Sequence, residues 1–295
     1  MPARPMDRLL PVRSVLVVYK KSSRPVPGWS RSRAADPLVR RDRRRFLLAR
    51  RAHQRAMGQV LAALRESGLR ARVTQRARSL DARPYTLMIA IGGDGTFLEA
   101  ARCVAGAGQR ILGVNSDPER SAGSFCSTDG ASFAGKLRRI LRGRAKTTRL
   151  HRMELRLNGR RLGAPVLNDI LVTHRRPAAM SRYWLRVGAA REEQRSYGLW
   201  IATAAGSTGA IRSAGGRPLP RSSRALVYRP RELYSGAGLR CRLRGGAVPA
   251  GHRVVVGSLM SEGMICADGE HMTYPFRYGD VLEMRPSARP LRVVA

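Results

Sequence analysis

In the first half of the chain, short apolar runs alternate with segments that have the spacing of amphipathic helices. Ser14–Tyr19 and Thr86–Ile91 are compact apolar runs, typical of strands that are buried on both faces. Between them, apolar residues recur on one face from Phe46 to Leu64, which predicts a helix. The remaining predictions are strands at Leu69–Thr74 and Ile111–Val114, a start for that helix at Asp36 or Asp42 and an end at Gly68, and a second helix from Ser127 or Asp129 to about Leu141. This alternation predicts a doubly wound, mostly parallel sheet.

The pattern changes after about Gly143, where short strands are separated by turns. Asn158-Gly159 is a strong signal for a tight hairpin. The predicted strands are Met153–Leu157, Arg182–Val187, Leu199–Thr203, Leu239–Leu243, Arg253–Gly257, Met264–Ala267 and Val281–Arg285. We therefore expect an α/β nucleotide-binding domain over residues 1–145 and an all-β, sandwich-like domain over residues 146–295, with the ligand between the two.

The most informative segment is a Gly-Gly-Asp-Gly-Thr turn at Gly92–Thr96, between a predicted strand and a predicted helix at Phe97–Ala105. Strand, glycine turn and helix together present backbone N–H groups and a helix N-terminus to phosphate. A carboxylate in such a turn repels phosphate unless a metal neutralises it or it accepts a proton, so Asp94 is a candidate chemical group. The alternative is an ordinary turn in which Asp94 only caps the helix.

Two further polar segments follow apolar runs. Asn168-Asp169 comes directly after Val166-Leu167, a position suited to hydrogen bonding with the hydroxyls of a ligand. The segment Gly198–Pro218 contains a Gly-Ser-Thr-Gly turn at Gly206–Gly209 and a Ser-Ala-Gly-Gly turn at Ser213–Gly216. Asn115 also follows a predicted strand, so Asn115 and Asp94 are expected to face one crevice at the carboxyl ends of the strands.

The order of these motifs resembles that of the NAD kinases, and the resemblance extends over most of the chain, roughly Val15 to Arg292. Ala267-Asp268-Gly269-Glu270 is similar to the late Asp-Gly-Gln turn of that family. The stretch that begins with Asn115-Ser116-Asp117-Pro118 is similar to the mitochondrial and plant NADH kinase branch. The resemblance implies an NAD kinase-like fold.

The resemblance also implies an activity: transfer of the γ-phosphoryl group of ATP to the 2′-hydroxyl of the adenosine ribose of NAD+ or NADH. Asp94 is then the base at that hydroxyl, and Mg²⁺ arrives on the nucleotide phosphates rather than on protein ligands. The implied NAD-binding residues are Gly95, Thr96, Phe97, Asn168, Asp169, Thr208, Gly209 and Ser213. The implied phosphate-binding residues are Gly92, Gly93, Asn115, Gly206 and Ser207. A core-packing role for Phe97 stays open, and the family's habit implies a homo-oligomer, dimer or tetramer.

Three positions depart from the pattern of the family. Asp169 stands where the family has glutamate, Ala210 where it has an aromatic residue, and Tyr197 where many bacterial members have an acidic residue. A lost stacking surface costs about 1–3 kcal/mol of binding if nothing replaces it. The choice between NAD+ and NADH, and between ATP and polyphosphate as donor, is therefore open at this stage.

Composition adds limits. The formal charge of +36 comes from 56 lysines and arginines against 20 acids, and the arginines are spread along the whole chain. Scattered arginine favours a solvated surface that attracts anionic nucleotides over a dedicated nucleic-acid partner. The four cysteines form no CxxC unit, which argues against a zinc ribbon and favours a reducing compartment. No apolar run is long enough to span a membrane and no signal segment is evident, so a cytoplasmic protein is expected.

Two other function classes use parts of this pattern. Lipid kinases that act on diacylglycerol or sphingoid bases share the Gly-Gly-Asp-Gly-Thr turn, but the Gly-Thr-Gly-Asn-Asp stretch that follows it in those enzymes is absent here. A non-catalytic nucleotide- or RNA-binding relative is the other alternative, and an intact Asp94 argues against it.

Overall fold

The structure is a computed structural model that describes residues 11–20, 36–75, 80–106, 108–236, 240–269 and 272–295. The chain divides into two compact units. Unit 1 comprises Met1–Thr148 and Arg292–Ala295, and unit 2 comprises Arg149–Leu291. The last four residues, which the sequence analysis assigned to the β-rich domain, therefore belong to unit 1. Within the part of the chain described, no helix is long and apolar enough to cross a membrane.

Unit 1 is built on a largely parallel sheet in the order β2-β1-β3-β4-β19-β6, and β5 also pairs with β4. Its strands are β1 (Val15–Tyr19), β2 (Ala71–Gln75), β3 (Leu87–Gly92), β4 (Arg110–Asn115), β5 (Cys126–Asp129), β6 (Thr147–Leu150) and β19 (Leu291–Val294). β3 and β4 are buried along their whole length, as continuous apolar runs predict for central parallel strands. The doubly wound α/β prediction is confirmed.

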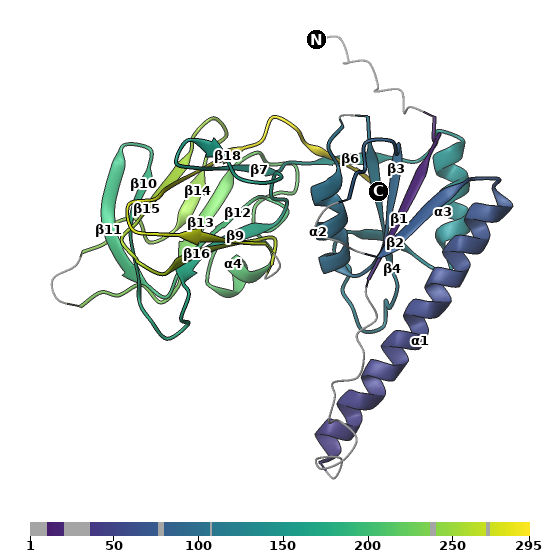
Figure 1. Ribbon diagram of the computed structural model, residues 1–295, viewed down its shortest axis with the longest axis horizontal. Coiled ribbons are helices and arrows are strands. Elements are labelled where there is room, and N and C mark those ends of the chain that lie inside the picture. Colours follow the sequence, from purple (N-terminus) through teal and green to yellow (C-terminus); the bar gives the residue numbers. More distant parts are fainter. Residues whose placement is uncertain (1–10, 21–35, 76–79, 107, 237–239, 270–271) are drawn as a thin grey trace. The chain divides into compact units, whose positions relative to one another are not determined.

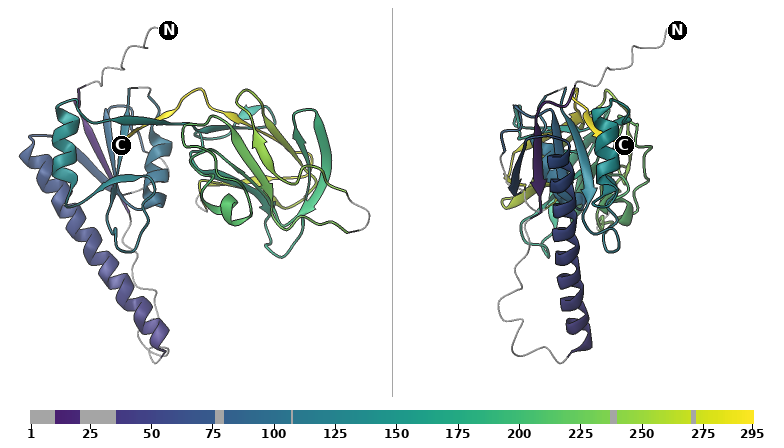
Figure 2. Two further views of the ribbon diagram at one scale, coloured as in Figure 1. Left: turned by 180° about the vertical axis from the view of Figure 1, so that it is seen from behind. Right: turned by 90° about the vertical axis from the view of Figure 1, so that its right-hand side faces the viewer.

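Helices cover both faces of this sheet. α1 (Pro37–Glu66) and α3 (Phe133–Leu141) lie on one face and α2 (Asp94–Cys103) on the other, as Figure 1 shows. The Asp36 carboxylate caps α1 by accepting a hydrogen bond of 2.7 Å from the Leu38 amide. Figures 1 and 2 show that the N-terminal half of α1 extends beyond the sheet, so only its C-terminal half packs on the strands.

The region before α3 differs from its prediction. Ser127 and Asp129, the two predicted starts of a helix, both lie in β5, and α3 begins only at Phe133. The Asp129 carboxylate accepts hydrogen bonds from the backbone N–H and the hydroxyl of Ser132, at 2.8 and 2.7 Å, and so closes a turn ahead of the helix. Ser127 does not cap a helix, because its hydroxyl donates to the Val294 carbonyl of β19 at 2.8 Å.

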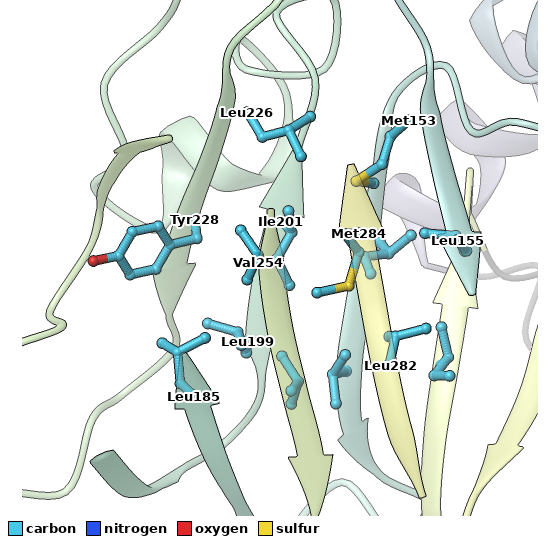
Figure 3. Close-up of a cluster of buried hydrophobic side chains, with 14 of the residues drawn as sticks. Met153, Leu155, Leu185, Leu199, Ile201, Leu226, Tyr228, Val254, Leu282 and Met284 are labelled. Carbon is cyan, nitrogen blue, oxygen red and sulfur yellow. The ribbon is translucent and has the colours of Figure 1, made fainter. Parts of the chain in front are cut away.

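Unit 2 consists mainly of two antiparallel sheets, in the orders β11-β10-β15-β18-β7-β8 and β14-β13-β12-β9-β16-β17. Its strands are β7 (Met153–Leu157), β8 (Arg160–Arg161), β9 (Asp169–His174), β10 (Ser181–Val187), β11 (Ala190–Ser196), β12 (Leu199–Ala202), β13 (Leu226–Pro230), β14 (Gly246–Val248), β15 (Val254–Ser258), β16 (Gly263–Ala267), β17 (Thr273–Phe276) and β18 (Val281–Pro286), with one short helix, α4 (Ala210–Ser213). Inward-facing apolar side chains of both sheets form a single core, part of which Figure 3 shows. The sandwich-like prediction is confirmed.

Some strands of unit 2 were expected and others were not. The Asn158-Gly159 hairpin is present, with φ of 51° and 79°, between β7 and β8. The strand predicted at Leu239–Leu243 is wrong for residues 240–243, which lie outside the strands, and Leu239 lies outside the described residues. β11 was missed because Ala190–Ser196 is polar, and only its pairing with β10 makes it a strand.

Candidate functional site

The first candidate region lies in unit 1, where β3 runs into α2. Gly93 is the N-cap of α2, and Asp94 is its first residue. The Thr96 and Phe97 amides donate to the Gly93 carbonyl at 3.0 and 3.2 Å, whereas the Asp94 and Gly95 amides precede the first turn and have no intrahelical acceptor. The predicted strand, glycine turn and helix N-terminus are therefore assembled, with Asp94 at the positive end of the helix dipole.

Close packing explains one of the glycines. A Cβ on Gly92 would meet the Thr96 side chain, with the Thr96 Cβ at 2.8 Å and its Oγ1 nearer still. Thr96 is itself only 3 % exposed and has little room to move away. Gly92 therefore has a packing role, whereas Gly95 is exposed and accessible to a ligand.

The Asp94 carboxylate is held by a second segment of unit 1. Its Oδ1 accepts a hydrogen bond of 2.9 Å from the Phe125 amide, while Oδ2 has no hydrogen-bond partner among the described residues. The neighbouring Cys126 thiol is buried, and that burial, with a smaller contribution from the charge of Asp94, raises its pKa to about 12. One oxygen of Asp94 is thus fixed and the other is available.

Asn115 organises the segment that holds Asp94. It lies opposite Gly92 in the β3–β4 register and is 8 % exposed. Its side-chain amide donates to the Ser121 carbonyl at 2.9 Å, and its Oδ1 accepts from the Asp117 amide at 3.1 Å. Asn115 and Asp94 do meet at one end of the sheet, but the Asn115 side chain is occupied in shaping the loop that leads to Phe125.

Phe97 was expected in contact with NAD or in the core. Its ring is fully buried and stacks on the ring of Phe125, with centroids 5.1 Å apart and planes 6° apart. A ring with no exposed surface has no face to offer a ligand in this structure, which favours the packing role. Through Phe125, this pair also fixes the amide that binds Asp94.

The second candidate region lies in unit 2, around Asn168 and Asp169 at the start of β9. The Asp268 carboxylate accepts hydrogen bonds from the Leu167 amide at 3.1 Å and the Asn168 amide at 2.7 Å. The Asn168 side-chain amide donates to Asp169 Oδ2 at 3.1 Å. Asn168 is half-buried and Asp169 is buried, so Asn168 is the more accessible of the predicted pair.

The environment of Asp169 changes its proton affinity. Burial, and then the nearby charge of Asp268, raises the pKa of the Asp169 carboxyl to about 7. Arg152 is the buried cation of this region, and burial lowers its pKa to about 10, an effect that the charge of Asp268 partly offsets. Near neutral pH, Asp169 therefore exists in both protonation states and can donate or accept a hydrogen bond.

The Gly206–Gly209 turn packs against this pair. A Cβ on Gly206 would meet the backbone carbonyl of Asn168, so only glycine fits there. Ser207 is fully buried; its hydroxyl donates to the Ala204 carbonyl and accepts from the Leu219 amide, both at 2.8 Å. Gly206 and Ser207, predicted to bind phosphate, therefore serve to shape the turn in this structure. The exposed members are Thr208, Gly209 and Ser213.

Three groups that hold the two candidate regions in place were not among the predicted site residues. Asp268 stood in a recognised Asp-Gly turn, and its left-handed φ of 49° identifies a special position, but only the fold reveals that it binds the amides before β9. The Thr203 hydroxyl donates a hydrogen bond to the Leu167 carbonyl at 2.6 Å and accepts one from the Gly206 amide at 3.3 Å. The third, the Phe125 amide, leaves no signal in a sequence because every residue but proline has one.

Metal coordination has no preformed cluster in these regions. Over the described residues, no group of three or more histidine, cysteine, aspartate or glutamate side chains could hold a metal ion. The chemistry these residues offer is instead that of a positioned carboxylate, backbone amides at a helix N-terminus, and hydrogen-bonding groups for hydroxyls.

Comparison with known proteins places these features in a family. Residues 41–144 match the family described as the ATP-NAD kinase N-terminal domain. A probable NADH kinase of Oryza sativa subsp. japonica is 37 % identical over 229 residues, which cover 70 % of each chain. An NADH kinase of Arabidopsis thaliana is 34 % identical over 233 residues, covering 72 % of this chain and 73 % of the plant protein.

Solved structures share the fold at lower identity. A yeast NADH kinase complexed with NADH has a TM-score of 0.71 at 17 % identity, covering 97 % of this chain and 84 % of that chain. An NAD kinase from Archaeoglobus fulgidus in complex with ATP has a TM-score of 0.67 at 19 % identity, covering 96 % and 93 %. With the strand–turn–helix around Asp94 and the identity to the plant proteins, this chain belongs to the NAD kinase family, and its plant relatives are NADH kinases.

Proposed function

We propose that this protein is an NAD(H) kinase, which transfers the γ-phosphoryl group of ATP to the 2′-hydroxyl of the adenosine ribose of NAD+ or NADH. Membership of the NAD kinase family supports this activity. The observation that carries it is the Asp94 carboxylate, anchored by one oxygen to the Phe125 amide and presented at the N-terminus of α2.

In this proposal Asp94 is the base. The hydrogen bond from the Phe125 amide fixes Oδ1 at 2.9 Å, which leaves Oδ2 to accept the proton of the attacking 2′-hydroxyl. Phosphoryl transfer has a loose transition state, so the proton leaves late and a carboxylate is basic enough. The main contribution of Asp94 is then to orient the hydroxyl toward phosphorus.

The phosphates are assigned to the start of α2. The amides of Asp94 and Gly95 precede the first helical hydrogen bond, and the helix dipole favours negative charge at this end. Mg²⁺ carried in with ATP would supply charge neutralisation for the phosphates. The chain's own part is to hold the phosphate oxygens with these backbone donors.

The ribose is assigned to the residues of unit 2 around Asn168 and Asp169. Asn168 has an accessible side-chain amide, and a carboxyl with a pKa of about 7 can exchange donor and acceptor roles with a hydroxyl pair. Thr208, Gly209 and Ser213 are exposed along the same segment, and we assign them to the dinucleotide as well. The plant relatives support NADH as an accepted substrate, and the family's habit supports a homo-oligomer.

The Asp94→Asn variant tests the proposal. Asparagine keeps the shape and the contact with the Phe125 amide but removes the base, so the rate of NADP(H) formation is expected to fall about 10²–10⁴-fold. The measurement is a coupled assay of NADP(H) with ATP and Mg²⁺, run with NAD+ and NADH in parallel.

The matched control is Glu119→Gln, which removes one carboxylate from an exposed ion pair with Arg120 and is expected to leave the rate unchanged. Circular dichroism of both variants checks that the fold is intact. An Asp94→Asn enzyme that works at nearly the wild-type rate would show that Asp94 is not the base.

A further inference from the structure

A cavity of about 740 Å³ lies in unit 2, and none of its lining residues belongs to the regions assigned above. Its polar lining includes Arg186, Arg224, His252, Arg253, Glu283 and Arg285. Four guanidinium groups and a single carboxylate make it strongly electropositive. Volumes of this order are typical of pockets that bind small molecules.

The sheet explains why these side chains converge. Leu185 of β10 points into the core, so Arg186, the next residue, faces outward. In the register of the sheet Arg186 lies beside Val255, and Val255 lies beside Glu283. Charged residues of β10 and β18 therefore lie on the outer face of this sheet, on either side of Val255 in β15, with neighbouring strands spaced about 4.8 Å apart. Asp169 belongs to the other sheet, and Asn168 directly precedes it.

Two of the four arginines are already paired. Arg253 contacts Glu283 at 2.9 Å, and Arg285 contacts Glu154 at 2.8 Å. Arg186 and Arg224 have no carboxylate within ion-pair distance among the described residues. The charge of Arg224 reaches His151, whose pKa is lowered by burial first and then by Arg224 and Arg149. The cavity thus contains two cations that no acid of the described chain neutralises.

We propose that this cavity is a second anion site, which binds an oligophosphate chain, either free or as the triphosphate of a nucleotide. Arginine suits this ligand because its planar fork of donors can form two parallel hydrogen bonds with one phosphate group. Guanidinium groups on β10, on β18 and in the nearby loops can each engage a different phosphate of the chain. Gly188 and Gly251 also line the cavity, and with no side chain they leave the backbone open to the ligand.

The test is a calorimetric titration of the full-length protein with inorganic tripolyphosphate, ATP and AMP at fixed salt. The variant is Arg186→Gln/Arg224→Gln, which removes the two unpaired cations. It is expected to lose one equivalent of bound tripolyphosphate, or to bind that equivalent at least about tenfold more weakly, since each charge-assisted hydrogen bond is worth about a factor of ten or more. At this site of the wild-type protein, tighter binding of ATP than of tripolyphosphate identifies a nucleotide site. Tighter binding of tripolyphosphate than of ATP identifies a site for a bare phosphate chain.

The matched control is Arg138→Gln/Arg139→Gln, which removes the same charge from exposed positions of α3 in unit 1. It is expected to bind tripolyphosphate as wild type does. Equal binding by wild type and the Arg186→Gln/Arg224→Gln variant would overturn the proposal. Equal losses in the variant and the control would also overturn it, because the effect would then be one of net charge.

NADP(H) formation, measured on the same samples, is expected to be retained by both variants, which separates this site from the kinase reaction. If the double variant unfolds, Arg224→Gln alone, at an exposed position, replaces it.

Discussion

At the scale of single residues, burial gives the two acids of unit 2 different tasks. Asp268 is 5 % exposed, and its carboxylate accepts hydrogen bonds from the Leu167 and Asn168 amides, which makes it a positioning residue. Asp169 is equally buried, but its carboxylate accepts a hydrogen bond only from the Asn168 side-chain amide among the described residues. Its charge is therefore poorly compensated, which is why its pKa is raised to about 7. A destabilising group kept at this place fits the proposed contact with ribose.

The Asp169→Asn variant is accordingly expected to be more stable than the wild-type protein but less active. The folded-state pKa of Asp169 is raised above its unfolded value, so the destabilisation by its charge is absent below about pH 4, grows as pH rises, and is complete above about pH 7. At pH 8 the variant should therefore gain on the order of 2–4 kcal/mol in free energy of unfolding, and at pH 4 it should gain little.

Urea unfolding of Asp169→Asn at both pH values measures this difference, with Asp42→Asn on exposed α1 as a control expected to stay within about 0.5 kcal/mol of wild type. In the NADP(H) assay, kcat/KM of Asp169→Asn for NADH is expected to fall about tenfold or more. A variant that is no more stable at pH 8 than at pH 4 would contradict the assigned effect of burial.

At the scale of elements, the contact between α1 and the turn before α3 depends on one small residue. A Cβ on Gly130 would lie 2.8 Å from the Ala56 Cα and would also meet the Gln59 side chain, so the turn touches the backbone of α1. A helix backbone cannot yield as a flexible side chain can. This approach is what lets α1 and α3 cover the same face of the sheet.

Two glycine-to-alanine changes should thus have opposite effects. Gly130→Ala is expected to cost about 1–3 kcal/mol of stability, because α1 or the turn must shift. Gly135→Ala, inside α3 and with nothing within 4 Å of the added methyl group, is expected to gain about 0.5–1 kcal/mol from helix propensity. Thermal or urea unfolding of the two variants measures these changes in stability. A change of the same sign in both variants would contradict the assigned packing of Gly130 against α1.

At the scale of the whole molecule, the path of the chain ties the two units together twice. The chain leaves unit 1 after Thr148 and returns to it at Arg292. There β19 pairs in parallel with β4, through Arg292 with Arg110 and Val293 with Ile111. Leu291 and Val294 have no exposed surface. The end of the chain is therefore an interior strand of the first unit's sheet.

Removal of residues 291–295 should destabilise unit 1, although these residues are far in sequence from the rest of that unit. The loss of the buried Val293 and Val294 side chains costs at least about 3 kcal/mol, and it leaves β4 without one of its partners. Hydrogen exchange measured by mass spectrometry is expected to show faster exchange in β4 than in the intact chain, with strands such as β10 in unit 2 unchanged. Unchanged protection of β4 would show that β19 contributes little to the sheet.

Elements whose signal is local follow from the sequence alone, and the family follows with them. β3, β4 and α1 follow from apolar periodicity and the Asp36 cap, and the strand–turn–helix around Asp94 follows from glycine spacing. Such signals lie within a few residues of one another, so a linear pattern can carry them. The resemblance of the ordered motifs to the NAD kinases was sufficient for the fold, as the relatives and solved structures confirm.

Features that depend on partners distant in the chain become clear only from the fold. The polar β11 is a strand because β10 pairs with it, and the C-terminal strand joins unit 1 because β4 has an open edge for it. In the structure, the buried Asn115 amide and the Ser207 hydroxyl make hydrogen bonds that hold loops. Asp268 and the Phe125 amide hold the proposed functional groups in place. The physical reason is that hydrogen bonds and burial are satisfied by whichever groups the fold brings near, and a sequence pattern does not record that proximity.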